Sequence, residues 1–414
     1  MYSSRAKARE VQKVVREAAV GVTDFWSRNA RLTTRSALGT LFFALFSLSA
    51  TAATLPDDRL DILYHGYKGG GATIDGPSVL VRKTFADKVS VRANYYTDFV
   101  SSASIDVIAT ASAYEEERNE FSVGMDYLHN KTTMSLNVTS SSENDYEAQT
   151  VGFSISQDFF GDLSTLALSY AVGSDTVRRR DDDVFEDEID RQQFSLTFTQ
   201  ILTQKLVASL AVESIVDEGF LNNPYRQYRF VDASEPLGFG YALELYPRTR
   251  NSDAVALRSL YYLPWHASLK GEYRRFADSW GIEADSVEFG YTHPWKHGLT
   301  FEAKLRHYKQ DDADFYSDIF AFEGAQNFLA RDKELSTFTS NTIGIGVSYE
   351  IPNKLWGLAK KSTVNLFWDR IAFDYDNFRD VTVHNTNPGA FAVGSEPLYS
   401  FDADVIRLFL SVWY

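Results

Sequence analysis

The sequence predicts an all-β fold: a transmembrane antiparallel up-and-down β-barrel of about 16 strands, with long extracellular loops and short periplasmic turns. Three observations favour this class. The 30 Phe and 23 Tyr, against 3 Met and 10 Pro, are typical of strands. After residue 53 no long apolar run could form a transmembrane helix, so only a closed barrel could cross a membrane. From Leu60 onward, alternating segments recur at the length that a tilted membrane strand needs.

The chain ends in the clearest of these segments, IRLFLSVWY. Ile406, Leu408, Leu410, Val412 and Tyr414 occupy every second position, so an extended chain presents them on one face. The stretch resembles the terminal sorting signal of bacterial outer-membrane barrel proteins. An ordinary sheet-edge strand is the alternative.

Residues 1–53 are predicted to be a basic lead plus a secretory signal peptide, and residues 54–414 the barrel. Arg31 and Arg35 precede an apolar run over 37–50, and small residues follow, so we expect cleavage after Ala52 or Ala53. Residues 1–30 fit an amphipathic helix, a long basic region before the signal, or a start codon placed too far upstream.

The remaining strands are predicted from two-residue alternation of apolar and polar side chains. In order, the segments lie near 60–68, 79–85, 89–96, 121–127, 134–138, 151–155, 166–172, 194–198, 206–212, 255–261, 267–273, 287–291, 299–305, 343–349, 364–368 and 398–414. Connections after even-numbered segments are short, and those after odd-numbered segments are expected to be long or polar, which is typical of a membrane barrel. A soluble sandwich also alternates, but has no reason to keep one class of connection short.

Aromatic residues recur at the short turns, where a girdle at the membrane interface is expected. They are Phe159, Phe160, Trp265, Trp295 and Trp356.

The charge of the chain argues against a nucleic-acid partner. Residues 1–53 hold 8 of the 41 Lys and Arg and 3 of the 56 Asp and Glu, so the remainder carries 33 cations and 53 anions, a formal charge of −20. Such a surface repels phosphate backbones. The absence of cysteine excludes disulfides and thiolate metal sites.

Side chains opposite the apolar faces are predicted to line a lumen wide enough for water. In the middle strands this set is small and uncharged, as at Asn137, Ser154, Ala167 and Thr199. In later strands it is charged, which gives eight lumen or constriction candidates: Arg258, Lys270, Glu272, Arg274, Glu288, Glu302, Lys304 and Arg306. Two interpretations stay open, a transverse field that selects solutes as in a porin constriction, or a mutually paired ladder that holds the wall rigid.

The longest loop, about residues 217–250, combines apolar side chains with arginines, so we expect it to fold inward and pair with lumen carboxylates. Its inward-loop candidates are Asn222, Asn223, Tyr225, Arg226, Arg229, Arg248 and Arg250. Such a loop would narrow the pore, cradle an acidic or aromatic ligand, or plug the mouth. Over 316–331, apolar residues near helical spacing predict a short lid helix.

No metal site and no catalytic centre are expected. Acidic clusters at 181–190 and 311–314, predicted to lie in outer loops, do not copy a calcium-binding loop, and Arg178, Arg179 and Arg180 adjoin the first. Hydrolysis would require a histidine oriented beside a nucleophile. His307 lies near Asp311 and Asp312, but the parity of its strand directs it outward.

Several stretches resemble one family of uncharacterised bacterial outer-membrane β-barrel proteins, the domain of unknown function 3570 family. They are ASIDVIATAS (103–112), GFLNNPYR (219–226), PRTRNSDAVALRSLYYLP (247–264), YRRFADSWGI (273–282) and RHYKQDDADFY (306–316), and the likeness spans essentially all of residues 54–414. It implies the barrel fold but no activity. It also implies a link to envelope redox modules, because relatives tend to be encoded beside a flavin transferase, a thioredoxin-like protein and a small lipoprotein.

Together these observations predict a channel or porin-like transporter in the bacterial outer membrane. A barrel that houses or docks an envelope lipoprotein or redox module is the alternative, and an outer-membrane hydrolase is a third. No cofactor is expected. The expected partners are outer-membrane lipid, the barrel-assembly machinery and a small lipoprotein or periplasmic redox protein.

Overall fold

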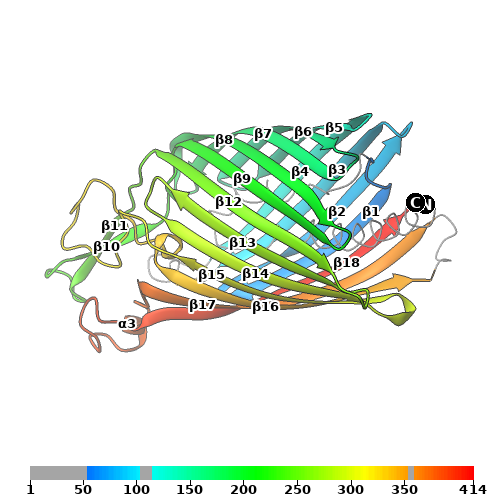
Figure 1. The fold of residues 1–414 in the computed structure, drawn as a ribbon. Coiled ribbons are helices and arrows are strands. Elements are labelled where there is room, and N and C mark those ends of the chain that lie inside the picture. Colours follow the sequence, from blue (N-terminus) through cyan, green and yellow to red (C-terminus); the bar gives the residue numbers. More distant parts are fainter. Residues whose placement is uncertain (1–53, 103–113, 353–358) are drawn as a thin grey trace.

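The fold is a closed antiparallel barrel of 16 strands, as predicted (Figure 1). The computed structural model describes residues 54–102, 114–352 and 359–414, so the expected signal peptide and Trp356 lie outside the described residues. Neighbouring strands follow the order β1-β18-β17-β16-β15-β14-β13-β12-β9-β8-β7-β6-β5-β4-β3-β2. The described residues contain no helix long and apolar enough to span a membrane.

The barrel strands are long enough to cross a bilayer when tilted. Their bounds are β1 (Arg59–Gly69), β2 (Ala72–Phe85), β3 (Val89–Ser102), β4 (Tyr114–His129), β5 (Thr132–Ser142), β6 (Tyr146–Phe159), β7 (Ser164–Arg179), β8 (Asp182–Thr203), β9 (Leu206–Gly219), β12 (Thr249–Tyr262), β13 (Ser268–Asp278), β14 (Glu283–Pro294), β15 (Leu299–Gln310), β16 (Phe338–Ile351), β17 (Lys361–Arg379) and β18 (Leu398–Trp413).

The pleat of each strand sorts side chains between the outside and the lumen. In β5, Leu136 and Val138 are exposed on the outer face, whereas Asn137 and Thr139 are buried on the inner one. Comparable apolar side chains continue around the outside, including Phe198, Leu257, Phe301 and Leu408. An apolar exterior around a polar interior is the arrangement of a barrel immersed in lipid.

One end of the barrel, here called the turn end, carries short connections and the C-terminus (Figure 1). Asn130 and His297 adopt the left-handed backbone conformation there, at φ 55° and 61°, which lets two strands reverse within a few residues. Of the predicted girdle residues, Phe160, Trp265 and Trp295 are strongly exposed at this end.

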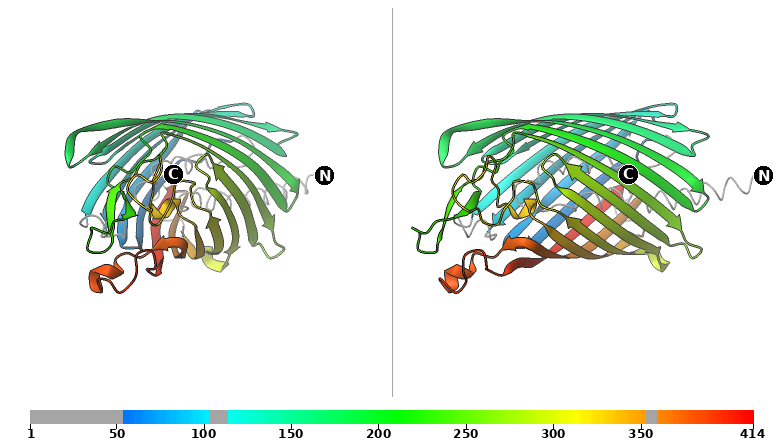
Figure 2. Two further views of the ribbon diagram at one scale, coloured as in Figure 1. Left: turned by 90° about the vertical axis from the view of Figure 1, so that its left-hand side faces the viewer. Right: turned by 60° about the vertical axis from the view of Figure 1, so that its left-hand side comes forward.

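At the opposite end, here called the loop end, the lengths of the connections differ from the prediction. The connections after β1, β5, β7 and β13 are short; the first is only Gly70 and Gly71, both at positive φ. The length is concentrated in residues 220–248, 311–337 and 380–397, which gather at this end (Figure 2). They contain the two-stranded sheet of β10 (Gln227–Val231) and β11 (Phe239–Leu243), the 3₁₀ turn η5 (Lys333–Leu335) and the short helix α3 (Val383–Thr386).

Two local predictions at the loop end were wrong. The acidic cluster at 181–190 is not a loop, because Asp182–Thr203 forms β8, whose first residues pair with the end of β7. The lid helix over 316–331 does not form. Phe320 pairs with Phe230, and Leu329 pairs with Leu245. Both side chains pack in one cluster with Tyr228 and Phe230, placed there by these pairings and not by a helix.

The barrel is closed by its two terminal strands. β18 pairs with β1 from Trp413 opposite Arg59 to Ala403 opposite Gly69. Ile406 and Leu408 are exposed on the outer face, and Arg407 between them is buried in the lumen wall. The alternation of the predicted sorting signal therefore exists in the folded chain, while its role in sorting stays a prediction.

Candidate functional site

Charged side chains cross the lumen wall in one row from β12 to β15. The strand register aligns Arg258 with Glu272, Glu272 with Glu288, and Glu288 with Arg306. Arg258 Nε donates to Glu272 at 2.9 Å, and Lys270 Nζ donates to Glu288 at 2.8 Å. Lys270 also lies 3.4 Å from Glu272, so the four groups form a continuous ladder of opposite charges.

A second group crosses β15 to β18, towards the turn end. Lys304 Nζ lies 3.2 Å from Asp369, and Arg407 Nη2 donates to the same oxygen at 2.5 Å. Lys304 reaches β17 across Gly344 of β16, where a Cβ atom would lie 2.1 Å from Asp369 Oδ1. Neither Asp369 nor Arg407 was among the predicted site residues. Both lie on the lumen parity of their strands, which is the signal that could have found them.

The same crossing recurs on the opposite wall. Arg92 of β3 lies over Gly124 of β4, and its guanidinium donates to Asn137 of β5 at 3.3 Å. It also bonds Asp126 at 3.1 Å. A glycine in the middle strand thus leaves the space that a long cation needs to reach the strand after next.

All eight lumen candidates lie on the inner face of the barrel, on β12 to β15. The paired ladder is therefore present, and Arg274 extends it through Glu213 at 3.3 Å. Within the described residues, no opposite charge lies at ion-pairing distance from Arg306 or Glu302. The Arg306 guanidinium lies 5.6 Å from the centroid of the Tyr308 ring. Selection of solutes by this wall stays a prediction.

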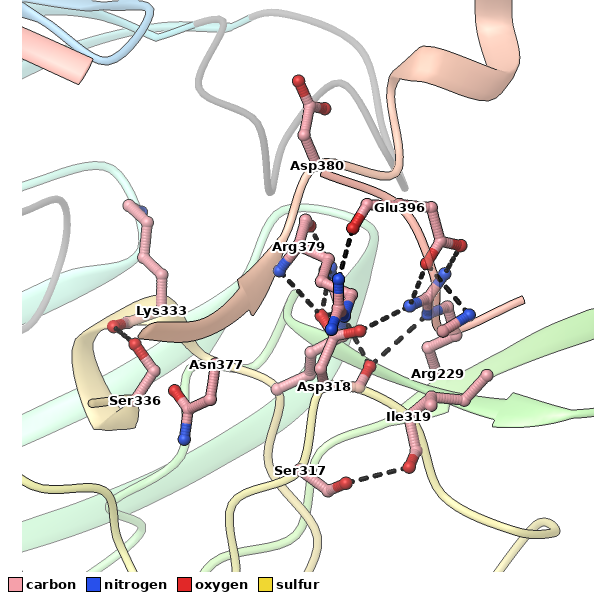
Figure 3. Close-up of polar contacts among 12 residues, drawn as sticks. Arg229, Ser317, Asp318, Ile319, Lys333, Ser336, Asn377, Arg379, Asp380 and Glu396 are labelled. Carbon is pink, nitrogen blue, oxygen red and sulfur yellow. Dashed lines mark hydrogen bonds and ion pairs between the residues drawn. The ribbon is translucent and has the colours of Figure 1, made fainter. Parts of the chain in front are cut away.

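The three long connections at the loop end fold together into one body, here called the loop cap (residues 220–248, 311–337 and 380–397). Its centre is Arg229, which is completely buried. The Arg229 guanidinium donates to Asp318 and to Glu396 at 2.5 Å each, so one side chain joins all three connections (Figure 3). Burial raises the pKa of Glu396, but the hydrogen bond from Arg229 outweighs it and holds that pKa at about 2.

Arg331 strengthens the same centre. It donates to Asp318 at 3.0 Å and to the backbone oxygen of Arg379 at 2.8 Å, and it lies 4.4 Å from the centroid of the Phe378 ring. The backbone N–H of Arg379 also donates to Asp318 at 3.0 Å (Figure 3). These bonds fasten the cap to the end of β17.

A second fastening lies between Arg226 and the η5 turn. Arg226 forms ion pairs with Asp332 and, at 3.4 Å, with Glu334. The Asp332 carboxylate also accepts the backbone N–H of Glu334 at 2.8 Å and so begins η5. Burial raises the pKa of Asp332 to about 7, and the nearby Glu334 and Glu244 act in the same direction against Arg226.

An apolar core seats the cap on the barrel. Phe315, Tyr316 and Leu335 of the cap are buried together with Phe338 and Tyr375 of β16 and β17. Other members are Trp280 and Ile282 of the β13–β14 connection and residues at the ends of β12 to β14. The cap is therefore a packed part of the fold and not a set of separate loops.

The inward-loop candidates divide into two groups. The first group bonds within the cap or to the neighbouring rim, and its members are Asn222, Asn223, Tyr225, Arg226 and Arg229. Asn222 bonds the backbone of Glu244, and Asn223 accepts from the Tyr225 N–H. The Tyr225 hydroxyl bonds Asp145 of the β5–β6 turn, outside the cap. Arg226 and Arg229 pair with cap carboxylates, not with the expected lumen carboxylates, because these connections are long enough to fold on one another.

Arg248 and Arg250 do not belong to an inward-folding loop. Arg248 is 61% exposed and makes a bidentate pair with Asp187 of β8, at 2.8 and 2.9 Å. Arg250 is part of β12, where it pairs with Asp278 and lies 4.5 Å from the centroid of the Trp280 ring. β12 begins at Thr249, earlier than the strand predicted over 255–261.

Two histidine–carboxylate pairs exist that sequence reasoning did not assemble. His65 Nε2 lies 2.7 Å from Asp98 and 2.9 Å from the Tyr96 hydroxyl, across Gly76 of β2. His384 Nε2 lies 3.1 Å from Glu396. In the described part of the chain, no Ser or Thr hydroxyl bonds either ring.

His307 faces outward as predicted and bonds Asn341 at 2.8 Å.

Three carboxylates approach one another at the loop end, with oxygens of Glu116, Glu143 and Asp145 within 4.8 Å. Each has a protein partner already: Arg180 at 3.5 Å, Arg118 at 3.9 Å and the Tyr225 hydroxyl respectively.

The family profile of proteins described as "Protein of unknown function (DUF3570)" matches residues 109–360. Among solved structures, a bacterial polysaccharide outer membrane secretin is 7% identical with a TM-score of 0.47, over 87% of this chain and 100% of its own. A Pseudomonas aeruginosa FadL homologue is 9% identical with a TM-score of 0.42, over 89% and 93%. The siderophore receptor PirA from Pseudomonas aeruginosa is 11% identical with a TM-score of 0.40, over 78% and 60%. No curated protein matches significantly. These structural likenesses concern the fold alone.

Proposed function

Because the chain belongs to the DUF3570 family of proteins of unknown function, its activity has to be argued from the barrel, and we propose an outer-membrane channel whose outer mouth is covered by the loop cap. On this proposal the chain is exported on a cleaved signal peptide, and the turn end faces the periplasm. It is a passage for small solutes and not an enzyme.

The observation that carries the proposal is the charged ladder on one wall of the lumen. Arg258, Glu272, Lys270 and Glu288 hold fixed charges on β12 to β14. Beyond β9, strands β5 to β8 present small uncharged side chains such as Ser154, Ala167 and Thr199. Across the lumen, β3 and β4 carry the pair of Arg92 and Asp126. Fixed charges on the wall of a water-filled passage orient and select solutes by charge.

The cap adds control of entry. Its connections are joined by buried ion pairs through Arg229, and breaking a buried pair on one side leaves an uncompensated charge that costs about 3–5 kcal/mol. A cap held in this way supports a closed resting mouth, with solute passage after the cap loosens.

Conductance of the full-length barrel in planar bilayers tests the proposal. We expect solute-dependent current, larger in Arg229→Met because Asp318 and Glu396 lose their common partner. Lys304→Gln should shift selectivity towards cations, since it removes a positive lumen charge beside Asp369. Arg275→Gln is the matched control, because Arg275 pairs with Asp285 on the outer face. Absence of current in both the native barrel and Arg229→Met would overturn the proposal.

Docking of an envelope partner is the second candidate, favoured by exposed apolar side chains on the cap. Large patches of this kind outside a membrane band mark interaction sites. The exposed side chains are Val231, Leu237, Leu243, Leu245, Phe322, Phe328 and Phe391. Isolation from native membranes should then recover a small lipoprotein or redox protein with the barrel, and a barrel that always purifies alone would count against this candidate.

A further inference from the structure

We propose that Arg306 and the side chains beside it in the lumen form a subsite for a small aromatic carboxylate. This inference rests on the proposed channel function and names the class of solute that the passage would favour. The site lies between the charged group around Asp369 and the core beneath the cap.

Arg306 differs from the other lumen cations of β12 to β15 because, within the described residues, no carboxylate lies at ion-pairing distance from it. Arg258, Lys270 and Arg274 each have a carboxylate within 3.3 Å. Arg306 points into the lumen, is half-buried, and has no carboxylate at ion-pairing distance within the described residues. A guanidinium in this state presents its paired N–H groups to a carboxylate, the geometry that gives the strongest charge-assisted hydrogen bonds.

The carboxylates nearest to Arg306 are engaged by other cations. Asp369 lies within ion-pairing distance of both Lys304 and Arg407. Glu288 of β14, which the register aligns with Arg306, accepts from Lys270 at 2.8 Å. An anion entering the site would therefore reach the guanidinium of Arg306 without displacing a protein carboxylate from it.

The row containing Arg306 has a small, largely apolar floor. The register aligns Arg306 with Thr342, then Ile371, then Ala403, on four consecutive strands. On the other side Arg306 is aligned with Glu288 of β14, which accepts from Lys270. Only a ligand that extends from Arg306 towards β18 would meet uncharged surface, chiefly that of half-buried Ile371.

Aromatic rings form the next row towards the cap. Tyr308, Phe373 and Phe401 are aligned across β15, β17 and β18, with Ser340 of β16 between the first two. Phe373 and Phe401 stack at 4.6 Å between centroids, and all three aromatic residues are half-buried. Rings that keep exposed edges beside a cation favour an aromatic anion over a plain one.

Calorimetric titration of the full-length barrel in detergent tests the inference with three probes: benzoate, acetate and benzyl alcohol. Benzoate should bind at least about tenfold more tightly than either of the others, because only benzoate uses both the cation and the apolar floor. Arg306→Gln should weaken benzoate binding about tenfold or more. Arg306→Lys should keep the preference for benzoate over benzyl alcohol, and Phe373→Leu should reduce the preference over acetate.

Arg275→Gln, on the outer face, should leave benzoate binding unchanged, and circular dichroism checks that every variant is folded. Equal binding of benzoate and benzyl alcohol, or of benzoate and acetate, would overturn the inference, as would a folded Arg306→Gln barrel with unchanged affinity. Because binding is measured without current, a barrel that conducts but ignores benzoate refutes only the subsite. A barrel that binds benzoate but never conducts refutes only the channel.

Discussion

At the scale of single residues, glycines decide which lumen side chains can meet. Gly344 and Gly124 each lie on a strand between two others, and a long side chain crosses each of them. A Cβ atom there would lie 3.0 Å from Lys304 Cε or 2.6 Å from Arg92 Cζ, so a residue with a side chain would obstruct the crossing. A glycine in the middle strand therefore lets a side chain contact the strand after next, so three strands are joined by one interaction instead of two.

Gly344→Val tests this role. Its Cβ would lie 2.1 Å from Asp369 Oδ1 and 3.0 Å from Lys304 Cε, so the ion pair would have to separate or the strands shift. We expect a loss of about 1–3 kcal/mol, typical of overpacking, in urea titration of the barrel in lipid vesicles. Gly66→Val is the matched control, since a Cβ atom at Gly66 would lie 3.9 Å from its nearest neighbour, Asp75 Cβ. Equal stability of the two variants would contradict the role of Gly344.

At this scale the sequence predicted which face of a strand each side chain occupies, but not which side chains it would contact. Two-residue alternation placed Arg258, Lys304 and Arg306 in the lumen, because the pleat is a local property of an extended chain. It could not pair Lys304 with Asp369, because that contact depends on the register of two successive strand pairs. The bond between His65 and Asp98 was missed for the same reason.

At the scale of elements, the loop cap shows how long connections find partners in one another. Arg229 reaches Asp318 and Glu396, and Arg226 reaches Asp332, all in other connections. The composition of residues 217–250 predicted inward folding, but the partners were assigned to the lumen wall. The apolar spacing of 316–331 predicts a helix, but the segment does not form one. Tyr316 and Ala330 pack in the core beneath the cap, and Phe320 and Leu329 pack in a second cluster.

The cap should also respond to pH through Asp332. Its pKa is about 7 in the closed cap and about 4 when exposed, so the closed state binds the proton more tightly. Closure is therefore most stable below pH ~4 and weakens as the pH rises through ~7. The charged groups around Asp332 are Arg226, Lys333, Glu334 and Glu244.

We expect hydrogen exchange in residues 311–337 to become faster between pH ~4 and ~7, after correction for the intrinsic pH dependence of exchange. Asp332→Asn should flatten this dependence, because the titrating group is gone. Asp187→Asn serves as the control, since Asp187 pairs with Arg248 on the exposed rim. Protection that rises with pH in the native chain would contradict the assignment.

At the scale of the whole molecule, the outer surface has a depth profile that a membrane should reveal. Leu136 lies within the apolar band of β5, whereas Ser142 lies on the same face at the loop end. Leu136→Arg should cost about 2–4 kcal/mol and Ser142→Arg about 0–1 kcal/mol, because the penalty for a charge falls from the bilayer centre to its edge. Urea titration in lipid vesicles measures both, and equal costs would mean that the band does not lie in lipid.

The sequence by itself determined the class of fold, the number of barrel strands and the face on which most side chains lie. These follow from an alternation repeated within each strand, which needs no knowledge of distant residues. Only the tertiary structure decided which charges meet, where the long connections pack and, within the described residues, which lumen cation has no carboxylate partner. Those outcomes join residues as far apart as Arg229 and Glu396, and their distances are set only once β18 has paired with β1 and the barrel has closed.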